Sequence, residues 1–188
     1  MKLQAAVSGY LPVGRSTVLA LSARGGRVVP LDGRSRTIIP KRFFMGGAGT
    51  IRGFAEEEMV PEDLRAGLAE EARHCATSLS QAGCTARGAD LAAGRTAASD
   101  GGEAYLLLKG ELRQSLGGSL ELGLFVDLGN LWLDPKRYRL VDLRPSAGLG
   151  LRFITPVGPA ALDLGFNLSP DGRLNERTLA PHFTIGLF

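Results

Sequence analysis

The sequence has no long hydrophobic run. Apolar stretches such as 104–108 and 159–166 are interrupted by polar or charged residues within a few positions, whereas a transmembrane helix needs about 18 or more consecutive apolar residues. A helical membrane span is therefore excluded. The amino terminus also lacks the continuous apolar core of a secretory signal, because Gly9 and Pro12 interrupt it.

The sequence also lacks an excess of one charge sign. It contains 22 Lys and Arg residues and 19 Asp and Glu residues, so its net charge is +3. This small net charge gives no reason to expect a nucleic-acid partner. Aromatic residues are scarce, at 6%, while glycine contributes 26 of the 188 residues, about twice its usual share of ~7%. Glycine at this level indicates bends and close backbone approach within sheets.

Histidine and cysteine are rare, with two residues of each. His74 precedes Cys75, and Cys84 follows shortly after, but no C-x-x-C pair is present, so we expect no metal site. A small loop-closing disulfide between Cys75 and Cys84 is favoured, and two free thiols are the alternative. Neither His74 nor His182 has a G-x-S-x-G nucleophile to partner it, so we expect neither an enzyme nor a cofactor.

Seven segments have the residue pattern of β-strands. In 119–132, for example, leucine and valine alternate strictly with polar, small or aromatic residues, which gives one apolar face and one polar face. The other strongly alternating segments show the same two faces. The predicted strands are 3–12, 17–28, 104–115, 119–132, 145–156, 159–169 and 182–188.

The connections between these strands distinguish two all-β architectures. A soluble sandwich also alternates apolar and polar residues. Here, however, the links 116–118 and 157–158 are very short, whereas 29–103, 133–144 and 170–181 are long and polar. Tight turns at one end of the strands and long loops at the other are typical of outer-membrane barrels.

The sequence therefore predicts an all-β fold, an antiparallel transmembrane β-barrel segment with a long inserted loop. Its leucine face would meet lipid and its polar face would line the lumen. Backbone groups in lipid must all be paired, so the sheet has to close. Because bacterial barrels have an even number of strands, seven strands are expected to be one part of a larger barrel.

Four stretches, in this order along the chain, resemble the bacterial surface antigen superfamily, the outer-membrane assembly and translocation proteins of BamA, TamA and two-partner-secretion type. The resemblance implies that residues 1–188 form the last part of the barrel and that upstream strands and periplasmic POTRA modules normally precede them. The matching stretches are FFMGGAGTIRGF (43–54), FVDLGNLW (125–132), RPSAGLGLRFITPVGPAALDLGF (144–166) and HFTIGLF (182–188).

The resemblance implies insertion of β-barrel proteins into the bacterial outer membrane, or translocation of polypeptides across it. The implied partners are outer-membrane lipid, unfolded client polypeptides and periplasmic accessory proteins bound through POTRA modules. The last strand would form a seam whose edge templates incoming strands. A passive porin-like barrel, the membrane anchor of a larger secreted protein and an inactive truncated remnant are the alternatives. The seam residues would be Phe183, Ile185, Leu187 and Phe188.

Within this family topology, residues 29–103 would be a long extracellular loop that folds back into the lumen. Its tip would carry Arg52, paired with one or both of Glu111 and Asp127 on adjacent strands, because a guanidinium can bond two carboxylates and stays charged. An exposed loop cation is the alternative. A phosphate-binding loop is not expected, because no P-loop Lys-Ser/Thr follows the glycines. The predicted loop-lock residues are Arg52, Gly46, Gly47, Gly53, Phe54, Glu111 and Asp127.

Three further expectations concern residues near this loop. Gly49 is expected to help the other loop glycines turn the chain and approach the wall. The segment 61–74 has a proline at its start, acids in its first turn and basic residues at its end, which predicts an amphipathic helix capping the loop, with a solvated irregular stretch as the alternative. Arg144 and Arg152 are expected to line the lumen or its rim.

Overall fold

The computed structural model of the chain describes residues 1–30, 37–77, 84–155 and 158–186. In this part of the chain, seven strands form one antiparallel sheet in sequence order. The predicted strand set and all-β fold are confirmed. The strands are β1 (Lys2–Pro12), β2 (Thr17–Val28), β3 (Ala104–Gly117), β4 (Leu120–Trp132), β5 (Arg144–Thr155), β6 (Gly158–Asn167) and β7 (Leu179–Ile185).

The boundary predicted for the last strand was wrong at its start. Strand β7 begins at Leu179, where the register pairs Leu179 with Phe166 of β6. Pro181 lies inside the strand, and proline counts against a central strand because it cannot donate to the ladder. It is tolerated here because β7 is at the edge of the sheet. The predicted seam residues Leu187 and Phe188 lie outside the described residues.

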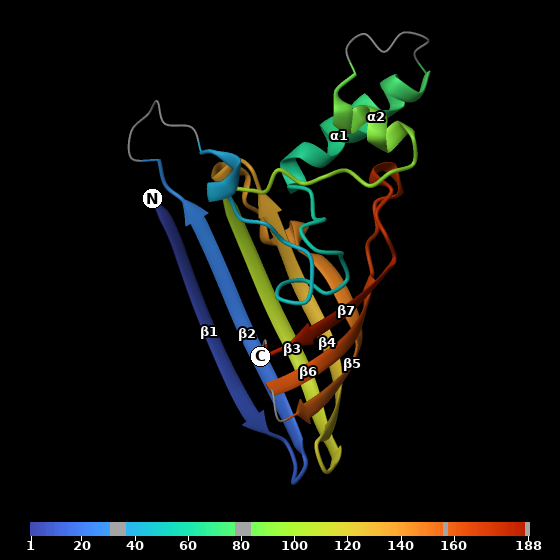
Figure 1. Cartoon of the computed structure of the whole chain (residues 1–188). Helices are drawn as coiled ribbons and strands as arrows, with labels where there is room; N and C mark the ends of the chain where they lie inside the picture. The colour runs from blue at the N-terminus through green and yellow to red at the C-terminus, as the bar shows by residue number, and fades with distance from the viewer. Residues whose placement is uncertain (31–36, 78–83, 156–157, 187–188) are drawn as a thin grey trace.

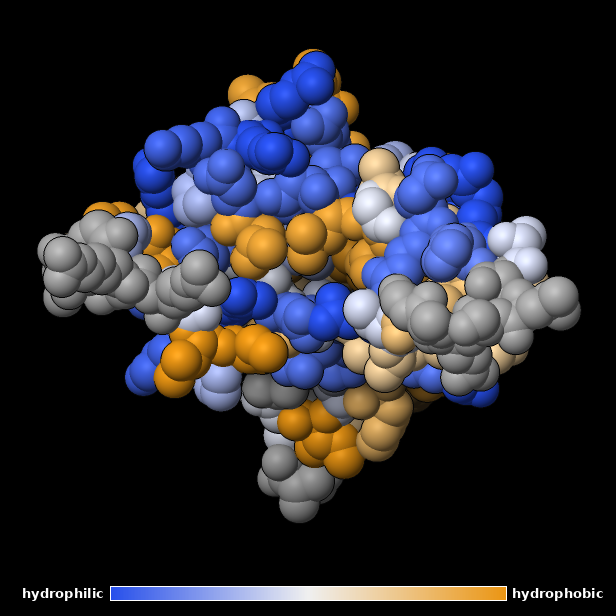
Figure 2. Space-filling model, turned by 90° about the horizontal axis from the view of Figure 1, so that it is seen from above, coloured by the Kyte–Doolittle hydropathy of each residue, from blue (hydrophilic) through white to orange (hydrophobic). Residues whose placement is uncertain are grey.

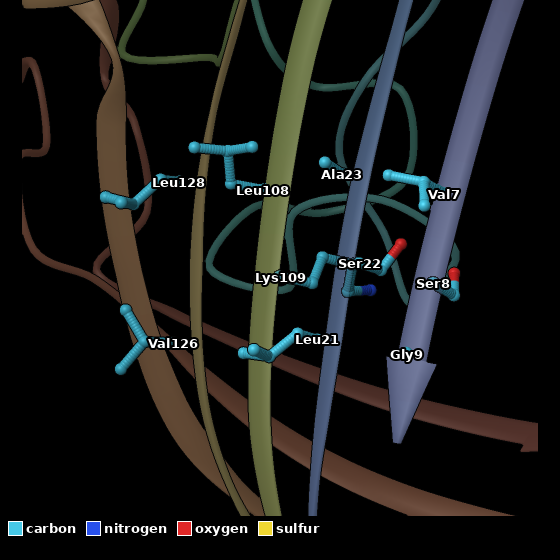
Figure 3. Close-up of a pocket in the computed structure, with 11 residues that line it drawn as sticks. Val7, Ser8, Gly9, Leu21, Ser22, Ala23, Leu108, Lys109, Val126 and Leu128 are labelled. Atoms are coloured by element: carbon cyan, nitrogen blue, oxygen red, sulfur yellow. The ribbon is translucent and has the colours of Figure 1, made fainter. Parts of the chain in front are cut away.

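The two faces of the sheet differ as the alternation predicts. In β4, Leu124 and Val126 are 48% and 51% exposed, whereas Phe125 and Asp127 are 3% and 0% exposed. The outer face also carries a shallow apolar hollow over β1 to β4 (Figure 3). An extended exposed apolar surface of this kind marks a site of contact with a membrane or with another protein. Aliphatic residues that line the hollow are Val7, Leu21, Ala23, Leu108, Val126 and Leu128.

The sheet is curved, and part of the connection between β2 and β3 lies on its inner side (Figure 1). The strand-facing part of this connection, residues 43–60, packs apolar side chains against the wall strands β3 and β4. This packing fixes the connection to the inner face by hydrophobic burial. The buried cluster consists of Met45, Ile51, Phe54, Met59, Leu107 and Leu131.

The same connection carries two helices, α1 (Glu62–Thr77) and α2 (Ala86–Ala92). They lie beyond one end of the sheet (Figure 1). The helix predicted at 61–74 is confirmed as α1, whereas α2 was not predicted. No helix in the described part of the chain is long and apolar enough to cross a membrane. The helices share a core that consists of Val60, Leu68, Ala69, Ala72, Leu91, Ala97 and Leu174.

Viewed from the end that carries the helices, hydrophilic residues cover much of the surface, with apolar patches between them (Figure 2). The long connections β2–β3, β4–β5 and β6–β7 meet at this end. The turn between β1 and β2 and the turn between β3 and β4 lie at the other end (Figure 1). The predicted asymmetry of short turns and long loops is therefore present.

Strands β1 and β7 form the two edges of the sheet. Among the described residues no ladder joins them, so the sheet is open. Because neighbouring strands alternate in direction, the first and seventh strands run the same way. Closure in an antiparallel barrel therefore requires an odd number of additional strands, which gives an even total. The sheet has the geometry of one part of a larger barrel.

Candidate functional site

The site begins with a tight turn that brings residues 50–54, called the loop tip below, to the inner wall. Gly46 and Gly47 have φ angles of 113° and 98°, which are favourable for glycine and strained for other residues. The turn is closed by two hydrogen bonds, from Gly47 N to Phe54 O at 3.0 Å and from Gly46 N to Thr50 Oγ1 at 2.9 Å. The local sequence thus aims Arg52 at the wall.

Arg52 hydrogen-bonds to both of the carboxylates, Glu111 and Asp127, that the alternation places on the inner face of β3 and β4. Its Nε and Nη2 donate to Asp127 at 2.9 and 2.8 Å, and its Nη1 donates to Glu111 at 2.7 Å. The Arg52 backbone N–H also donates to Asp127 Oδ2, at 3.0 Å. Arg52, Glu111 and Asp127 are 2%, 6% and 0% exposed. The structure therefore brings the three predicted charged residues together in a buried cluster.

Burial and pairing act in opposite directions on the charge of Arg52. Burial alone lowers the pKa of the guanidinium, but hydrogen bonds and charges from Asp127 and Glu111 outweigh it and raise the pKa above its ordinary value. The guanidinium therefore remains a cation in the lumen. A cation of this kind can leave the wall only by separating from Asp127 and Glu111, and from Asp163, whose carboxylate lies 3.7 Å from Arg52 Nη1.

An aromatic ring that was not predicted as part of the site supports the guanidinium. The Cζ atom of Arg52 lies 3.5 Å from the centroid of the Phe125 ring, a cation–π arrangement that is favourable when desolvated. The alternation does place Phe125 on the inner face, two positions before Asp127. The sequence could have pointed to Phe125 through this position, because an aromatic side chain on an otherwise polar face is expected to pack against another group.

A second arginine lies beside the first. Arg152, on β5, is 5% exposed, and its Nη2 lies 3.0 Å from the Glu111 carboxylate and 3.4 Å from Asp163 on β6. Arg113 donates from Nε to Glu111 at 2.8 Å. Arg152 therefore lines the inner side, as expected, and also shares a carboxylate with Arg52. Sequence reasoning did not foresee this sharing.

The loop tip also approaches β5 and β6 very closely. A Cβ atom placed on Gly53 would lie 2.5 Å from Ser146 Cβ, and one on Gly165 would lie 1.8 Å from the carbonyl oxygen of Arg52. Glycine is required at both positions for the tip to sit this deep. Gly165 was not predicted. The expectation for Gly49 was wrong, because a Cβ there would meet nothing within 4 Å.

The last strand contacts the loop tip through its inner face. His182 of β7 places Nε2 2.9 Å from the carbonyl oxygen of Arg52. Phe183 and Ile185, predicted for the seam, are 67% and 55% exposed on the other face. The tip and the last strand are thus joined directly.

Cys75 and Cys84 form a disulfide, with 5.7 Å between their Cα atoms. Cys75 lies in the last turn of α1 and Cys84 lies just before α2, so the bond belongs to the helical cap. Among the described residues no group of His, Cys, Asp and Glu side chains could hold a metal ion. The predicted loop-lock residues and the cysteines therefore belong to two separate places in the fold.

An open antiparallel sheet with an apolar outer face, long connections at one end and a charged loop tip bound to its inner face is the wall of a transmembrane β-barrel. The chain matches the model of the Omp85 superfamily domain over residues 1–188, and it belongs to that superfamily. The predicted resemblance is confirmed. At the level of the family, membership associates the chain with protein insertion and translocation and with integral barrels of the outer membrane.

A solved structure shares this fold. The crystal structure of BamA from Haemophilus ducreyi lacking POTRA domains 1–3 aligns with a TM-score of 0.65 and 18% sequence identity. The alignment covers 97% of this chain and 35% of that chain. The chain thus spans about a third of the length of that structure.

Proposed function

We propose that the protein containing this segment inserts β-barrel proteins into the bacterial outer membrane or translocates polypeptides across it. The observation that carries the proposal is the buried bonding of Arg52 to Asp127 and Glu111, in a chain that belongs to the Omp85 superfamily. The segment contributes three parts: a lipid-facing wall, a seam at β7, and an extracellular loop, residues 29–103, whose tip is locked in the lumen.

The lock, meaning the bonds of Arg52 to Asp127 and Glu111, acts through electrostatic attraction and involves no chemical reaction. Two wall carboxylates hold the guanidinium, so the docked loop fills the inner side of the sheet. Releasing it exposes two buried carboxylates, which carries a free-energy cost unless other charges compensate. The docked and released loops are therefore two discrete states. In this role the segment is not an enzyme, and it needs no cofactor or metal.

The seam acts through backbone hydrogen bonds. Strand β7 is short, spans Leu179–Ile185 and pairs with β6 on one side. An edge strand presents unpaired N–H and C=O groups that can pair with an extended segment of another chain. An unfolded client polypeptide is the partner that fits this edge. Lipid contacts the apolar outer face, and periplasmic accessory proteins would bind upstream POTRA modules.

A depletion and complementation experiment tests the proposal. Full-length protein is depleted in its host, and the outer-membrane levels of several folded barrel proteins are measured. We expect these levels to fall, to recover with the wild type, and to recover poorly with Arg52→Met or Asp127→Asn. Arg24→Met is the matched control, because Arg24 bonds the same loop through one exposed contact, to Gly49 O at 3.3 Å.

Each alternative has its own outcome. Normal client levels on depletion would support a passive porin-like barrel or a membrane anchor. A protein that never accumulates in the membrane would be a truncated remnant. Full recovery with both Arg52→Asp and Asp127→Arg as single changes would refute the lock while leaving the assembly function in place.

A further inference from the structure

A second buried ion pair lies outside the lock. Arg144 and Glu176 form a two-point contact, from Nη1 to Oε1 at 2.8 Å and from Nη2 to Oε2 at 2.5 Å. Their side chains are 3% and 2% exposed. Arg144 Nη2 also donates to the carbonyl oxygen of Ser169, at 2.6 Å. This geometry is the bidentate arrangement in which a guanidinium binds a carboxylate most strongly.

The pair joins two places that are distant in the sequence. Arg144 is the first residue of β5, and Glu176 lies in the connection from β6 to β7, just before β7 begins at Leu179. Glu176 also accepts a hydrogen bond from the backbone N–H of Asp171, at 2.7 Å. The pair therefore fixes the connection from which the last strand starts.

The same pair also contacts the inserted loop. Arg144 Cζ lies 4.7 Å from the centroid of the Phe54 ring, at the end of the loop tip. Asp171, which is bonded to Glu176, receives a charged hydrogen bond from Arg65 of α1 at 2.9 Å. One cluster of charged groups thus connects the loop tip, the helical cap and the start of β7. Its members are Arg144, Glu176, Asp171 and Arg65.

We propose that Arg144 and Glu176 are positioning residues that anchor the β6–β7 connection to the first residue of β5 and so keep the seam strand β7 in place. The inference deepens the proposed function, since it assumes that β7 is the seam. Removing one partner of a buried ion pair leaves the other charge uncompensated. The β6–β7 connection then has to move until the remaining charge reaches water, and β7 moves with it.

Amide hydrogen exchange of the full-length protein in lipid nanodiscs tests this inference. Glu176→Gln preserves the shape of the side chain and removes its charge. We expect the amides of residues 179, 180 and 182–185 to exchange about a hundredfold faster, because breaking a buried pair is strongly destabilising and exchange reports local opening. Amides of β4 should be unaffected. Glu176→Asp, which keeps the charge, should restore most of the protection.

The adjacent residue provides a matched control. Arg177 is paired with Glu58 at 3.8 Å, and its side chain is 65% exposed, so Arg177→Gln should leave the exchange of β7 unchanged. The inference would be overturned if Glu176→Gln left β7 as protected as in the wild type. It would also be overturned if β4 exchange accelerated equally, since that would show a general loss of stability.

This test is independent of the assembly function. Exchange is measured without client proteins, so a passive barrel with this ion pair would give the same result as an assembly factor. A failure in the complementation experiment therefore leaves the exchange result standing. Conversely, unchanged exchange in Glu176→Gln overturns the positioning role while leaving the assembly function untouched.

Discussion

Replacing Arg52 by methionine is expected to shift the loop tip from docked to released. Methionine keeps an unbranched apolar stem of similar length, so the contact with Phe125 is partly preserved. The change removes two side-chain hydrogen bonds to Asp127 and one to Glu111. The hydrogen bond from the backbone N–H to Asp127 does not depend on the side chain and remains.

Glu111 and Asp127 should not contribute equally to the free energy of docking that Arg52→Met removes. Glu111 still has Arg113 at 2.8 Å and Arg152 at 3.0 Å, so its charge stays compensated. Asp127, at 0% exposure, loses both of its guanidinium bonds. Removing one partner of a buried pair costs about 3–5 kcal/mol, and the remaining backbone bond favours the lower end. An expected cost of about 3 kcal/mol corresponds to roughly a hundredfold change in the docking equilibrium.

Labelling of a buried thiol measures that equilibrium. Ile51 is 0% exposed, so a cysteine introduced by Ile51→Cys would react only when the tip leaves the wall. Cys75 and Cys84 are joined in a disulfide and do not react. When reclosing is faster than labelling, the labelling rate follows the population of the open form. Full-length protein in nanodiscs with Arg52→Met should label about a hundredfold faster than its parent.

Controls and double mutants test the reasoning behind this number. Arg24→Met removes another arginine that bonds the same loop and should change labelling only slightly, since that pair is exposed. A double-mutant cycle should give a larger coupling energy for Arg52 with Asp127 than for Arg52 with Glu111. Equal labelling rates of the Arg52 and Arg24 variants, or the reverse order of coupling energies, would refute the conclusion that the Arg52–Asp127 pair holds the loop tip in its docked position.

Three further predictions follow from other parts of the fold. Gly165→Ala should release the loop tip, because its Cβ would lie 1.8 Å from a backbone oxygen; thiol labelling that stays slow would contradict this. A hydrogen bond from Arg173 is the main cause that lowers the pKa of Asp171 to about 2, so the stabilisation by this carboxylate is present above about pH 4 and is lost as the pH falls through about 2. An NMR titration of the Asp171 carboxyl carbon should show this low midpoint, and Arg173→Gln should raise the midpoint. Joint replacement of Cys75 and Cys84 by serine opens a loop with a sequence separation of 9 and should destabilise the helical cap by about 2–3 kcal/mol; trypsin cleavage within α1 should accelerate while thiol labelling of the tip is unchanged.

Most of the sheet could be predicted because one of its faces is apolar throughout. Period-two alternation determines the strand register when a shift by one residue would turn the leucines into the lumen. The observed register of β3 to β6 keeps the leucines of the alternating pattern on one face. The start of β7 was not predictable in the same way. Pro181 interrupts the pattern, and only the edge position of the strand, which is a property of the whole sheet, makes proline acceptable there.

The charged site was partly predictable for a similar reason. Alternation places Glu111 and Asp127 on the inner faces of adjacent strands, so the single arginine of the glycine-rich stretch 43–54 has an evident target. The bonding of Arg144 to Glu176 had no such signal, because Glu176 lies in an irregular connection. Where a connection folds depends on tertiary packing, here on the helical cap, and residue types alone do not encode it.

The loop tip contacts the inner face of more strands than the two that carry the lock. It bonds to β3 and β4 through Glu111 and Asp127, lies against β5 and β6 at Ser146 and Gly165, and meets β7 at His182. These contacts exist together only when five consecutive strands have this curvature. A change in sheet curvature must therefore break some of them, so docking of the loop and bending of the wall are a single equilibrium rather than two.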